Sequence, residues 1–391
     1  MNDQIGIQAT QYIISLFESS KSQSEEALDS LPGIYAIIES SGLILKGNKS
    51  LAQIFSVDYE NLLGCNLDQI FSPENWQEFQ NYIFRENSLP DPKINIRLSD
   101  GVARNYLWFS NPVRSNSIPN SKKLFAITGR DVTDLTRITE ENSRMQFELS
   151  TAKIVQNTFY PKPSAKFGNS TISGYSESAS ECGGDWWHYN NKKDKLYLWI
   201  GDVTGHGVTA ALVVSAVHAV VSIIDVNDLK PKDILALLNR AVGSMAGDQR
   251  PMTFLVAAID LKSGECTYAS AGHEPLIMLP ADKDKFEMRD LKILQGSASA
   301  PLGAQKTFDY QEAKIQLKKG DRLLFYTDGI YDVANSEGAR WTRSTFLRTL
   351  ARQATQHGQA SDLVSGLHKS IVDFRQQAPL RDDATFFTFQ M

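Results

Sequence analysis

Hydrophobic and polar positions change their period several times in the first third of the chain. Residues 5–17 have helical spacing and are followed by the polar run SSKSQSEE. The apolar runs IYAIIE and LILKG, separated by the turn SSG, predict a β-hairpin, after which Asn48 is placed to cap a short helix ending near Phe55. Short helical pieces and the runs INIRL, ARNYLWFS and LFAITGR then predict an order of two strands, short helices and three strands.

Residues 131–159 show a different pattern, because they contain no Gly or Pro and space their apolar residues alternately by three and four. The predicted seam consists of Leu135, Ile138, Asn142, Met145, Leu149, Ala152, Gln156 and Phe159. Two of these positions, Asn142 and Gln156, are polar. The pattern fits a coiled-coil dimer, and it also fits a helix packed on its own protein. Pro161 and Pro163 are expected to end the helix.

Short strands alternate with two helical regions from Lys166 onward. Residues 208–224 are apolar nearly all round, which predicts a helix covered by protein on every side. A second helical stretch extends from Trp341 to about Phe374, and DDATFFTFQ predicts a terminal strand. Mostly antiparallel strands with grouped helices predict a layered α+β fold and argue against a Rossmann fold.

The segment LPGIYAIIESSGLILKGNKSLAQIFSVDYENLLGCNLDQIF resembles a PAS sensor domain. The predicted organisation is therefore an N-terminal helix and polar segment at 1–26, a PAS-like sensor domain at 27–130, a helical linker at 131–162 and a second domain at 163–391. No histidine precedes residue 188, which excludes a histidine-ligated haem in the sensor domain. Cys65 is expected to be a small packing residue, and the sensor's ligand stays unassigned.

Composition narrows the possible classes of protein. The chain is 42% hydrophobic and 22% charged, as in globular proteins with extensive cores, and its net charge of -5 does not favour nucleic acid as a partner. No run of eighteen apolar residues predicts a membrane span, and the first residues do not resemble a signal peptide. Cys65, Cys182 and Cys266 are isolated and support neither disulfides nor a zinc site. A cytoplasmic location is the resulting expectation.

Acidic residues recur at predicted strand edges, beside glycines, turns or other acids. They are Asp185 in ECGGDWW, Asp202 in GDVTGHG, Asp328 in FYTDGIYD and the pair Asp382–Asp383 in RDDATFF. Taken singly, each has an ordinary explanation in turn or helix-entry chemistry. Taken together, they predict an acidic cluster suited to Mg²⁺ or Mn²⁺, which prefer oxygen ligands.

The glycines around these acids are consistent with such a site. Gly183, Gly184 and Gly201 are expected to let backbone and metal approach closely, and Gly205 and Gly207 to permit a sharp bend into the next helix. Two clustered cations could activate a bridging water and neutralise the oxygens of a phosphoryl group.

The ordered motifs GGDWW, GDVTGHGVTAAL, YASAGHEPLIML, APLG, GDRLLFYTDGIYD and RDDATFF closely resemble the RsbU/SpoIIE branch of metal-dependent, protein phosphatase 2C-like serine/threonine phosphatases. The resemblance covers about residues 165–391 and implies an αββα sandwich with two Mn²⁺ or Mg²⁺ ions. It implies that Asp185 and Asp202 bridge the metals, that the carbonyl of Val203 completes one site, and that Asp328 and Asp382 serve the other. Asp383 is the less secure ligand of its pair. No protein nucleophile is then required.

Some positions depart from the family pattern. His188 stands where a second Asp usually follows the two aromatics, and Asp332 stands where Glu usually follows the Tyr-Thr-Asp-Gly motif. Neither is a core metal ligand, so these departures bear on substrate fit. His206 and His273 could donate protons, but a structural role is the preferred interpretation.

The implied substrate is a phosphorylated STAS-type anti-anti-sigma protein in a partner-switching pathway, with the sensor domain regulating a homodimer joined through residues 131–159. Neither nucleic acid nor a membrane is expected as a partner. GGD also begins the diguanylate cyclase signature, but Trp-Trp follows here in place of Glu-Phe. The alternative from another class is a binding-only pseudophosphatase that sequesters its partner, which the presence of all the matching acids argues against.

Overall fold

The computed structural model describes residues 23–31, 33–83, 93–97, 103–113, 123–205, 207–224, 229–246 and 250–391. The helix predicted at residues 5–17 lies outside these ranges. The chain divides into two compact units, Met1–Arg144 and Met145–Met391, which are described separately.

The first unit is built on a five-stranded antiparallel sheet with the order β2-β1-β5-β4-β3. Its strands and helices are β1 (Ile34–Glu39), β2 (Ile44–Gly47), α2 (Lys49–Phe55), α3 (Pro73–Ile83), β3 (Lys93–Arg97), β4 (Ala103–Val113) and β5 (Leu124–Asp131), with short 3₁₀ turns at Tyr59–Asn61 and Leu67–Ile70. Asn48 caps α2 as predicted, since its Oδ1 accepts a hydrogen bond from the Leu51 amide at 3.2 Å. The predicted order of two strands, short helices and three strands is confirmed.

Helix α4 (Thr133–Asn157), which contains the boundary between the two units, confirms the helical prediction for this segment. The side chains of Leu135, Ile138 and Met145 are 63%, 50% and 60% exposed. Gln156, by contrast, is 4% exposed and is buried against residues of its own unit. The seam is therefore not uniform along the helix, because its C-terminal end packs within the chain.

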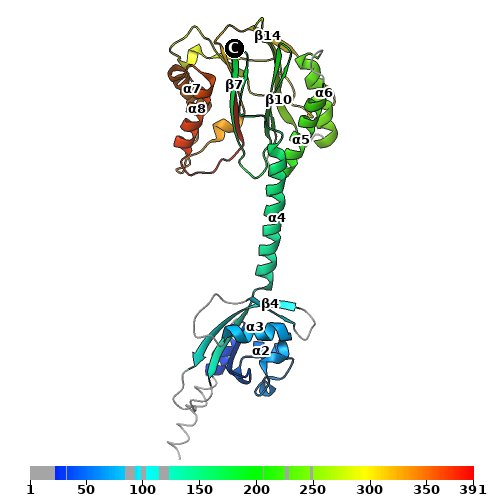
Figure 1. The fold of residues 1–391 in the computed structure, drawn as a ribbon, viewed down its shortest axis with the longest axis vertical. Coiled ribbons are helices and arrows are strands. Elements are labelled where there is room, and N and C mark those ends of the chain that lie inside the picture. The colour runs from blue at the N-terminus through cyan, green and yellow to red at the C-terminus, as the bar shows by residue number, and fades with distance from the viewer. Residues whose placement is uncertain are drawn as a thin grey trace, which may run out of the picture. The chain divides into compact units, whose positions relative to one another are not determined.

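The second unit contains two antiparallel sheets, with the orders β14-β11-β10-β9-β8 and β13-β12-β15-β16-β7-β6. The strands are β6 (Ser164–Phe167), β7 (Ser170–Glu177), β8 (Asp185–Lys192), β9 (Lys195–Val203), β10 (Met252–Asp260), β11 (Glu265–Ala271), β12 (Leu276–Leu279), β13 (Lys292–Leu294), β14 (Glu312–Gln316), β15 (Arg322–Tyr326) and β16 (Ala384–Gln390). The two sheets face each other across a core that includes Trp187, Leu198 and Phe387 (Figure 1).

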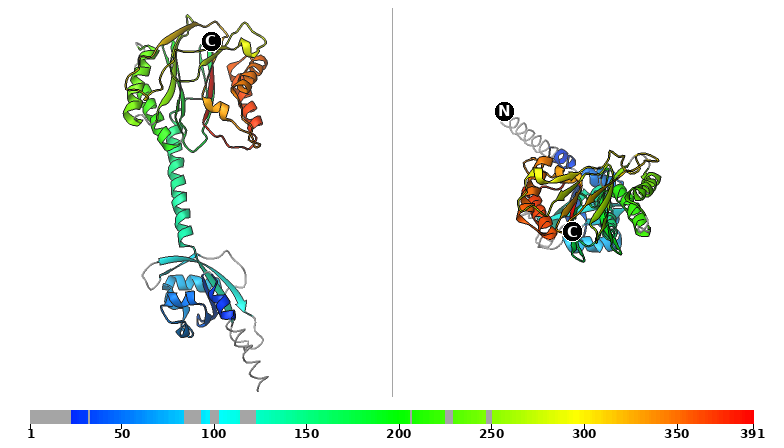
Figure 2. Two further views of the ribbon diagram at one scale, coloured as in Figure 1. Left: turned by 180° about the vertical axis from the view of Figure 1, so that it is seen from behind. Right: turned by 90° about the horizontal axis from the view of Figure 1, so that it is seen from above.

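Two pairs of helices cover the outer faces of these sheets (Figures 1 and 2). Helices α5 (Val208–Ile223) and α6 (Pro231–Ala246) pack on the β8–β11 sheet, and α7 (Arg343–Gln356) and α8 (Ala360–Arg375) pack on the other. The α+β class predicted from the sequence is confirmed.

Three details of the helices differ from the predictions. Helix α6 was not predicted, and the stretch after Trp341 is two helices, because the chain is extended from His357 to Gln359. Full coverage of the helix at residues 208–224 was a wrong prediction, since Leu212 is 54% and Ile223 is 84% exposed. An apolar circumference therefore does not ensure that every face of a helix is packed.

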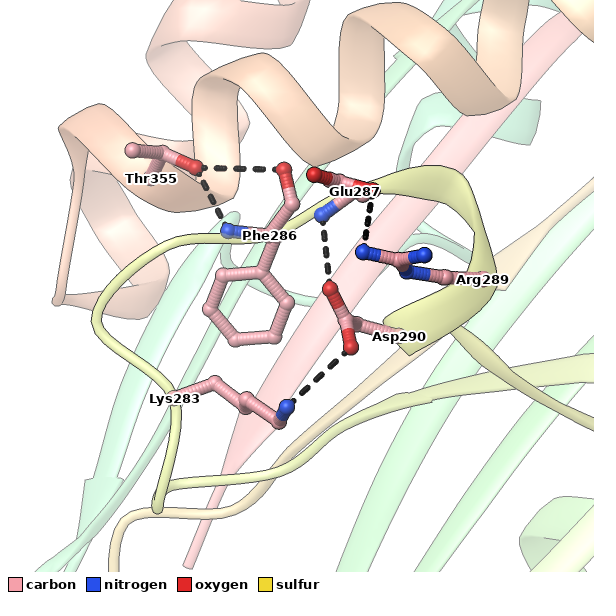
Figure 3. Close-up of polar contacts among 6 residues, drawn as sticks. All are labelled: Lys283, Phe286, Glu287, Arg289, Asp290 and Thr355. Carbon is pink, nitrogen blue, oxygen red and sulfur yellow. Dashed lines mark hydrogen bonds and ion pairs between the residues drawn. The ribbon is translucent and has the colours of Figure 1, made fainter.

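The connection between β12 and β13 is fastened to α7 (Figure 3). The Thr355 hydroxyl accepts a hydrogen bond from the Phe286 amide at 2.9 Å, and the Phe286 ring is buried against the helix. Lys283 forms an ion pair with Asp290 at 3.2 Å, which closes the loop on itself. This segment thus fixes to α7 the connection that leads into β13, the edge strand of its sheet.

Candidate metal site

The centre of the site is a pair of aspartates on neighbouring strands. Asp185, the first residue of β8, lies directly opposite Asp202, the penultimate residue of β9. Asp185 is 2% exposed, and its Oδ2 accepts a hydrogen bond from the Thr327 hydroxyl at 2.8 Å. Its Oδ1 is buried and accepts no hydrogen bond of normal geometry from any residue that the structure describes. One carboxylate oxygen is therefore left available for another partner.

Asp328 brings a third carboxylate to this pair from the second sheet. It begins the 3₁₀ turn Asp328–Asp332, directly after β15 and Thr327. Burial raises the pKa of Asp202 to about 8, with further contributions from the charges of Asp328, Asp382 and Asp383 and from the close approach of the Asp328 carboxyl. Burial also raises the pKa of Asp185, as does the charge of Asp202. The acids predicted to cluster are thus brought together, and they repel one another.

The two acids that precede β16 have different surroundings. Asp383 is 4% exposed, and its carboxylate accepts hydrogen bonds from the amides of Ala179 at 2.7 Å and Gly184 at 2.5 Å. Asp382 is partly exposed, and its Oδ1 accepts only the Asp383 amide at 2.9 Å. Burial raises the pKa of Asp382, as do the charges of Asp328 and Asp383. Asp383 therefore orders the loop before β8, while the second oxygen of Asp382 accepts no hydrogen bond from the part of the chain that the structure describes.

Two glycines are required where these loops meet. A Cβ on Gly184 would lie 3.0 Å from the carbonyl oxygen of Val203, and one on Gly329 would lie 1.9 Å from the carbonyl oxygen of Asp383. At Gly201 a Cβ would collide with the ring of Phe254, so packing also requires glycine there.

The donor set has the chemistry of a site for a hard divalent cation. It consists of oxygens only, it includes the buried, unpartnered Oδ1 of Asp185, and it holds carboxyl groups whose mutual repulsion a cation would relieve. Within the described ranges, no three Asp, Glu, His or Cys side chains stand in positions that could hold a metal ion as they are. The residues fit the cation by donor type, and binding requires a local adjustment of these side chains.

Residues from the end of α4 and the segment after it support the site, and the sequence did not mark them as such. The side chain of Gln156 makes two hydrogen bonds to the backbone of Gly183, its Nε2 donating to the carbonyl at 2.7 Å and its Oε1 accepting from the amide at 3.1 Å. The Tyr160 hydroxyl donates to the carbonyl of Asp185 at 2.6 Å. Thr327 was also missed, although it directly precedes Asp328. The polar Gln156 in an apolar seam was the available signal.

The histidines occupy supporting positions where they are described. His273 Nδ1 lies 2.8 Å from the hydroxyl of Thr253, whose backbone pairs with that of Asp202. Burial lowers the pKa of His273 to about 3, so the ring is neutral. His188 stacks on Trp186 at 5.6 Å, away from the acids on the helix-covered face of its sheet. His206 lies outside the described residues.

Comparison with known proteins assigns the C-terminal half of the chain to one family. Residues 192–391 match the model of the family described as Stage II sporulation protein E (SpoIIE). The chain is 26% identical over 223 residues to phosphoserine phosphatase RsbU of Bacillus subtilis, an alignment that covers 56% of this chain and 62% of the relative. It is 26% identical over 190 residues to phosphoserine phosphatase RsbP of the same organism, covering 47% and 45%. The chain thus spans between about half and three-fifths of these relatives.

A solved structure shows the same fold. The SiaA-PP2C domain of Pseudomonas aeruginosa superposes with a TM-score of 0.54 at 21% identity, covering 64% of this chain and 98% of that domain. Among the residues that the structure describes, no helix is long and apolar enough to cross a membrane.

Proposed function

Because the chain belongs to the SpoIIE family, we propose that its second unit is a metal-dependent protein serine/threonine phosphatase. The observation that carries this proposal is the meeting of Asp185 and Asp202 from one sheet with Asp328 and Asp382 from the other. The curated relatives RsbU and RsbP are both named phosphoserine phosphatases.

The proposed ligands of two Mn²⁺ or Mg²⁺ ions are Asp185, Asp202, Asp328 and Asp382, together with the backbone carbonyl of Val203. When bound, such ions supply Lewis-acid stabilisation of phosphoryl oxygens and lower the pKa of a water molecule. Thr327 holds one oxygen of Asp185, which would leave Oδ1 available to a bound cation. Asp383, proposed from the sequence as a further ligand, is better suited to orient the loop at Gly184, because backbone amides already occupy its oxygens.

The proposed substrate is a phosphorylated STAS-type regulatory protein in a partner-switching pathway. Support comes from the similarity to RsbU and RsbP, both named phosphoserine phosphatases. The sensor unit is proposed to be a PAS domain, which its antiparallel sheet and short helices support. Regulation would reach the phosphatase unit through α4, whose exposed Leu135, Ile138 and Met145 support a homodimer.

The test is release of phosphate from candidate phosphorylated STAS proteins by the full chain with Mn²⁺, followed by gel mobility. We expect turnover that EDTA abolishes and that Mn²⁺ or Mg²⁺ restores. Stable binding of the phosphoprotein without turnover at saturating metal would instead identify the protein as a binding-only phosphatase-like module.

A further inference from the structure

A cavity of about 540 Å³ lies beside the acidic site, between the two sheets of the second unit. It is lined by residues of β10 and β11, of the connection between β11 and β12 (residues 272–275), of the segment 294–299 and of the start of α7. The residues whose polar groups line it are Ser270, His273, Glu274, Gln295, Ser297, Ser299 and Arg343. Small residues, among them Gly272, Gly296 and Ala298, leave the space open.

The walls of this cavity are held by hydrogen bonds within the protein. The Ser299 hydroxyl accepts from the Gly272 amide at 2.9 Å and donates to the carbonyl of Ser270 at 2.7 Å. The Ser270 hydroxyl accepts from the His273 amide at 3.1 Å. These hydrogen bonds join the segment 294–299 to β11 and to the connection that follows it. The shape of the cavity is therefore fixed by contacts within the protein.

Three other polar side chains of the lining have no such role. Gln295, Ser297 and Arg343 form no side-chain hydrogen bond or ion pair with any other residue that the structure describes. Each can donate hydrogen bonds, and Arg343 carries a permanent positive charge in a planar fork that suits oxyanions. Arg343 is also the first residue of α7, where the partial positive charge of the helix end adds to its own. All three side chains are exposed, and Gln295 and Ser297 can accept as well as donate, so the charge of Arg343, set against the single carboxylate of Glu274 in the lining, is the feature that favours an anionic ligand.

The cavity is linked to the acidic site through two short connections. His273 in its wall contacts Thr253, which pairs with Asp202 across β9 and β10. Glu274 in its wall accepts a hydrogen bond from the Tyr326 hydroxyl at 3.2 Å, two residues before Asp328. The cavity wall is therefore connected to the ends of β9 and β15, the strands that lead to Asp202 and Asp328.

We propose that this cavity is a specificity subsite that binds an anionic side chain of the substrate polypeptide, flanking its phosphoserine, with Arg343 as the residue that selects it. This inference rests on the proposed phosphatase function and adds the class of substrate sequence. Arg343 forms the charge-assisted pair, and Gln295 and Ser297 supply further donors. The positive group also offsets the repulsion that an acidic segment would meet from the nearby aspartates.

A carboxylate of Asp or Glu and a second phosphorylated residue share the chemistry that Arg343 recognises. The probe that separates them is a series of fluorescent phosphoserine peptides, identical except that one Gln, Glu or second phosphoserine is moved along the flanking positions. Binding is measured by fluorescence anisotropy on the Asp202→Asn full chain, which should not consume the peptides. Turnover of the same peptides and of para-nitrophenyl phosphate is measured on the full chain with Mn²⁺.

At one flanking position we expect the anionic peptide to bind at least about tenfold more tightly than the Gln peptide, the size of effect that a charged hydrogen bond supplies. Arg343→Gln should remove this preference through KM, with kcat and para-nitrophenyl phosphate hydrolysis unchanged. Arg352→Gln, on the same helix but outside the cavity lining, is the matched control and should keep it. Arg343→Glu should favour a Lys peptide at that position. Whichever of the Glu peptide and the doubly phosphorylated peptide binds more tightly identifies the anionic group, carboxylate or phosphate, that the cavity selects.

Turnover without any flanking preference, or a preference that survives Arg343→Gln, overturns the subsite and leaves the phosphatase function standing. An Arg343-dependent preference in anisotropy, without turnover of any substrate at saturating Mn²⁺, supports the subsite and refutes the phosphatase function.

Discussion

Gln156 and Gly183 join the end of α4 to the loop that carries Asp185. The amide side chain of Gln156 satisfies both the N–H and the carbonyl of Gly183, at 3.1 and 2.7 Å, and the residue is 4% exposed. The next residue, Gly184, donates its amide to Asp383. Gly183 precedes Asp185, a proposed metal ligand, by two residues. The side chain of Gln156 therefore links the linker helix to the site, and a shift of the helix can affect the metal ligands.

Gln156→Ala should reduce both stability and activity. The change leaves two buried backbone groups of Gly183 without partners, at a cost of about 1–3 kcal/mol for each unsatisfied group. We expect a lower urea midpoint and a higher Mn²⁺ concentration for half-maximal phosphatase activity. Gln146→Ala, at an exposed position of the same helix, is the control and should leave both values unchanged. An unaltered metal requirement in the Gln156 variant would show that the contact is structural only.

A fragment that starts at Met145 should retain more phosphatase activity than one that starts at Pro163. The shorter fragment lacks Gln156 and Tyr160, and also Phe159, whose carbonyl accepts a hydrogen bond from the Trp186 indole at 3.0 Å. Hydrolysis of para-nitrophenyl phosphate and thermal unfolding should both distinguish the two fragments. Equal activity and equal melting temperatures would show that the end of α4 does not support the catalytic unit.

Asp202→Asn and Asp328→Asn should each abolish phosphatase activity while the fold persists. Loss of a direct ligand should exceed the roughly 10–100-fold cost that follows loss of an outer-shell partner. In EDTA above about pH 8, where Asp202 is ionised, both variants should resist urea at least as well as the parent, because each removes a charge from a group of like charges. Asp194→Asn, in the turn between β8 and β9, is the control. Full activity of the Asp202 and Asp328 variants at ordinary metal concentration would refute the site.

Ile138→Asp should convert the proposed dimer to a monomer. Ile138 and Met145 are 50% and 60% exposed in the single chain, and burial of such side chains contributes about 1.5–3 kcal/mol each. Light scattering at micromolar concentration measures the mass. Phe147→Asp changes an even more exposed apolar residue outside the predicted seam, and it should leave the dimer intact. A parent protein that is already monomeric would exclude dimerisation through α4.

His188 should make the fold less stable as the pH falls from about 6.5 to about 4. Burial, with a smaller contribution from the charge of the nearby His218, lowers the pKa of His188 to about 4. Because the folded-state pKa lies below the unfolded value, the stabilising contribution is complete above about pH 6.5 and is lost as the unfolded chain takes up the proton first. Urea unfolding at several pH values should show a shallower acid dependence for His188→Gln. The same slope in both proteins would contradict the prediction.

The sequence alone determined those features that depend on local order along the chain. Alternating runs and turn residues marked the strands, Asn48 marked the start of α2, and the motif order marked the family. Asp185, Asp202, Asp328 and Asp382 were recognisable because each stands where a strand begins or ends. Local chemistry of this kind requires no knowledge of distant partners.

The tertiary structure decided which of these residues meet and how each is used. Pairing of β8 with β9 and of β15 with β16 brings Asp185 close to Asp383, which is 198 residues away in the sequence, and it turns the Asp383 carboxylate toward backbone amides. It also showed that Gln156 belongs to the interior of the second unit and that Leu212 does not. Burial and hydrogen-bond satisfaction depend on what packs against a residue, and the pattern along the chain does not contain that information.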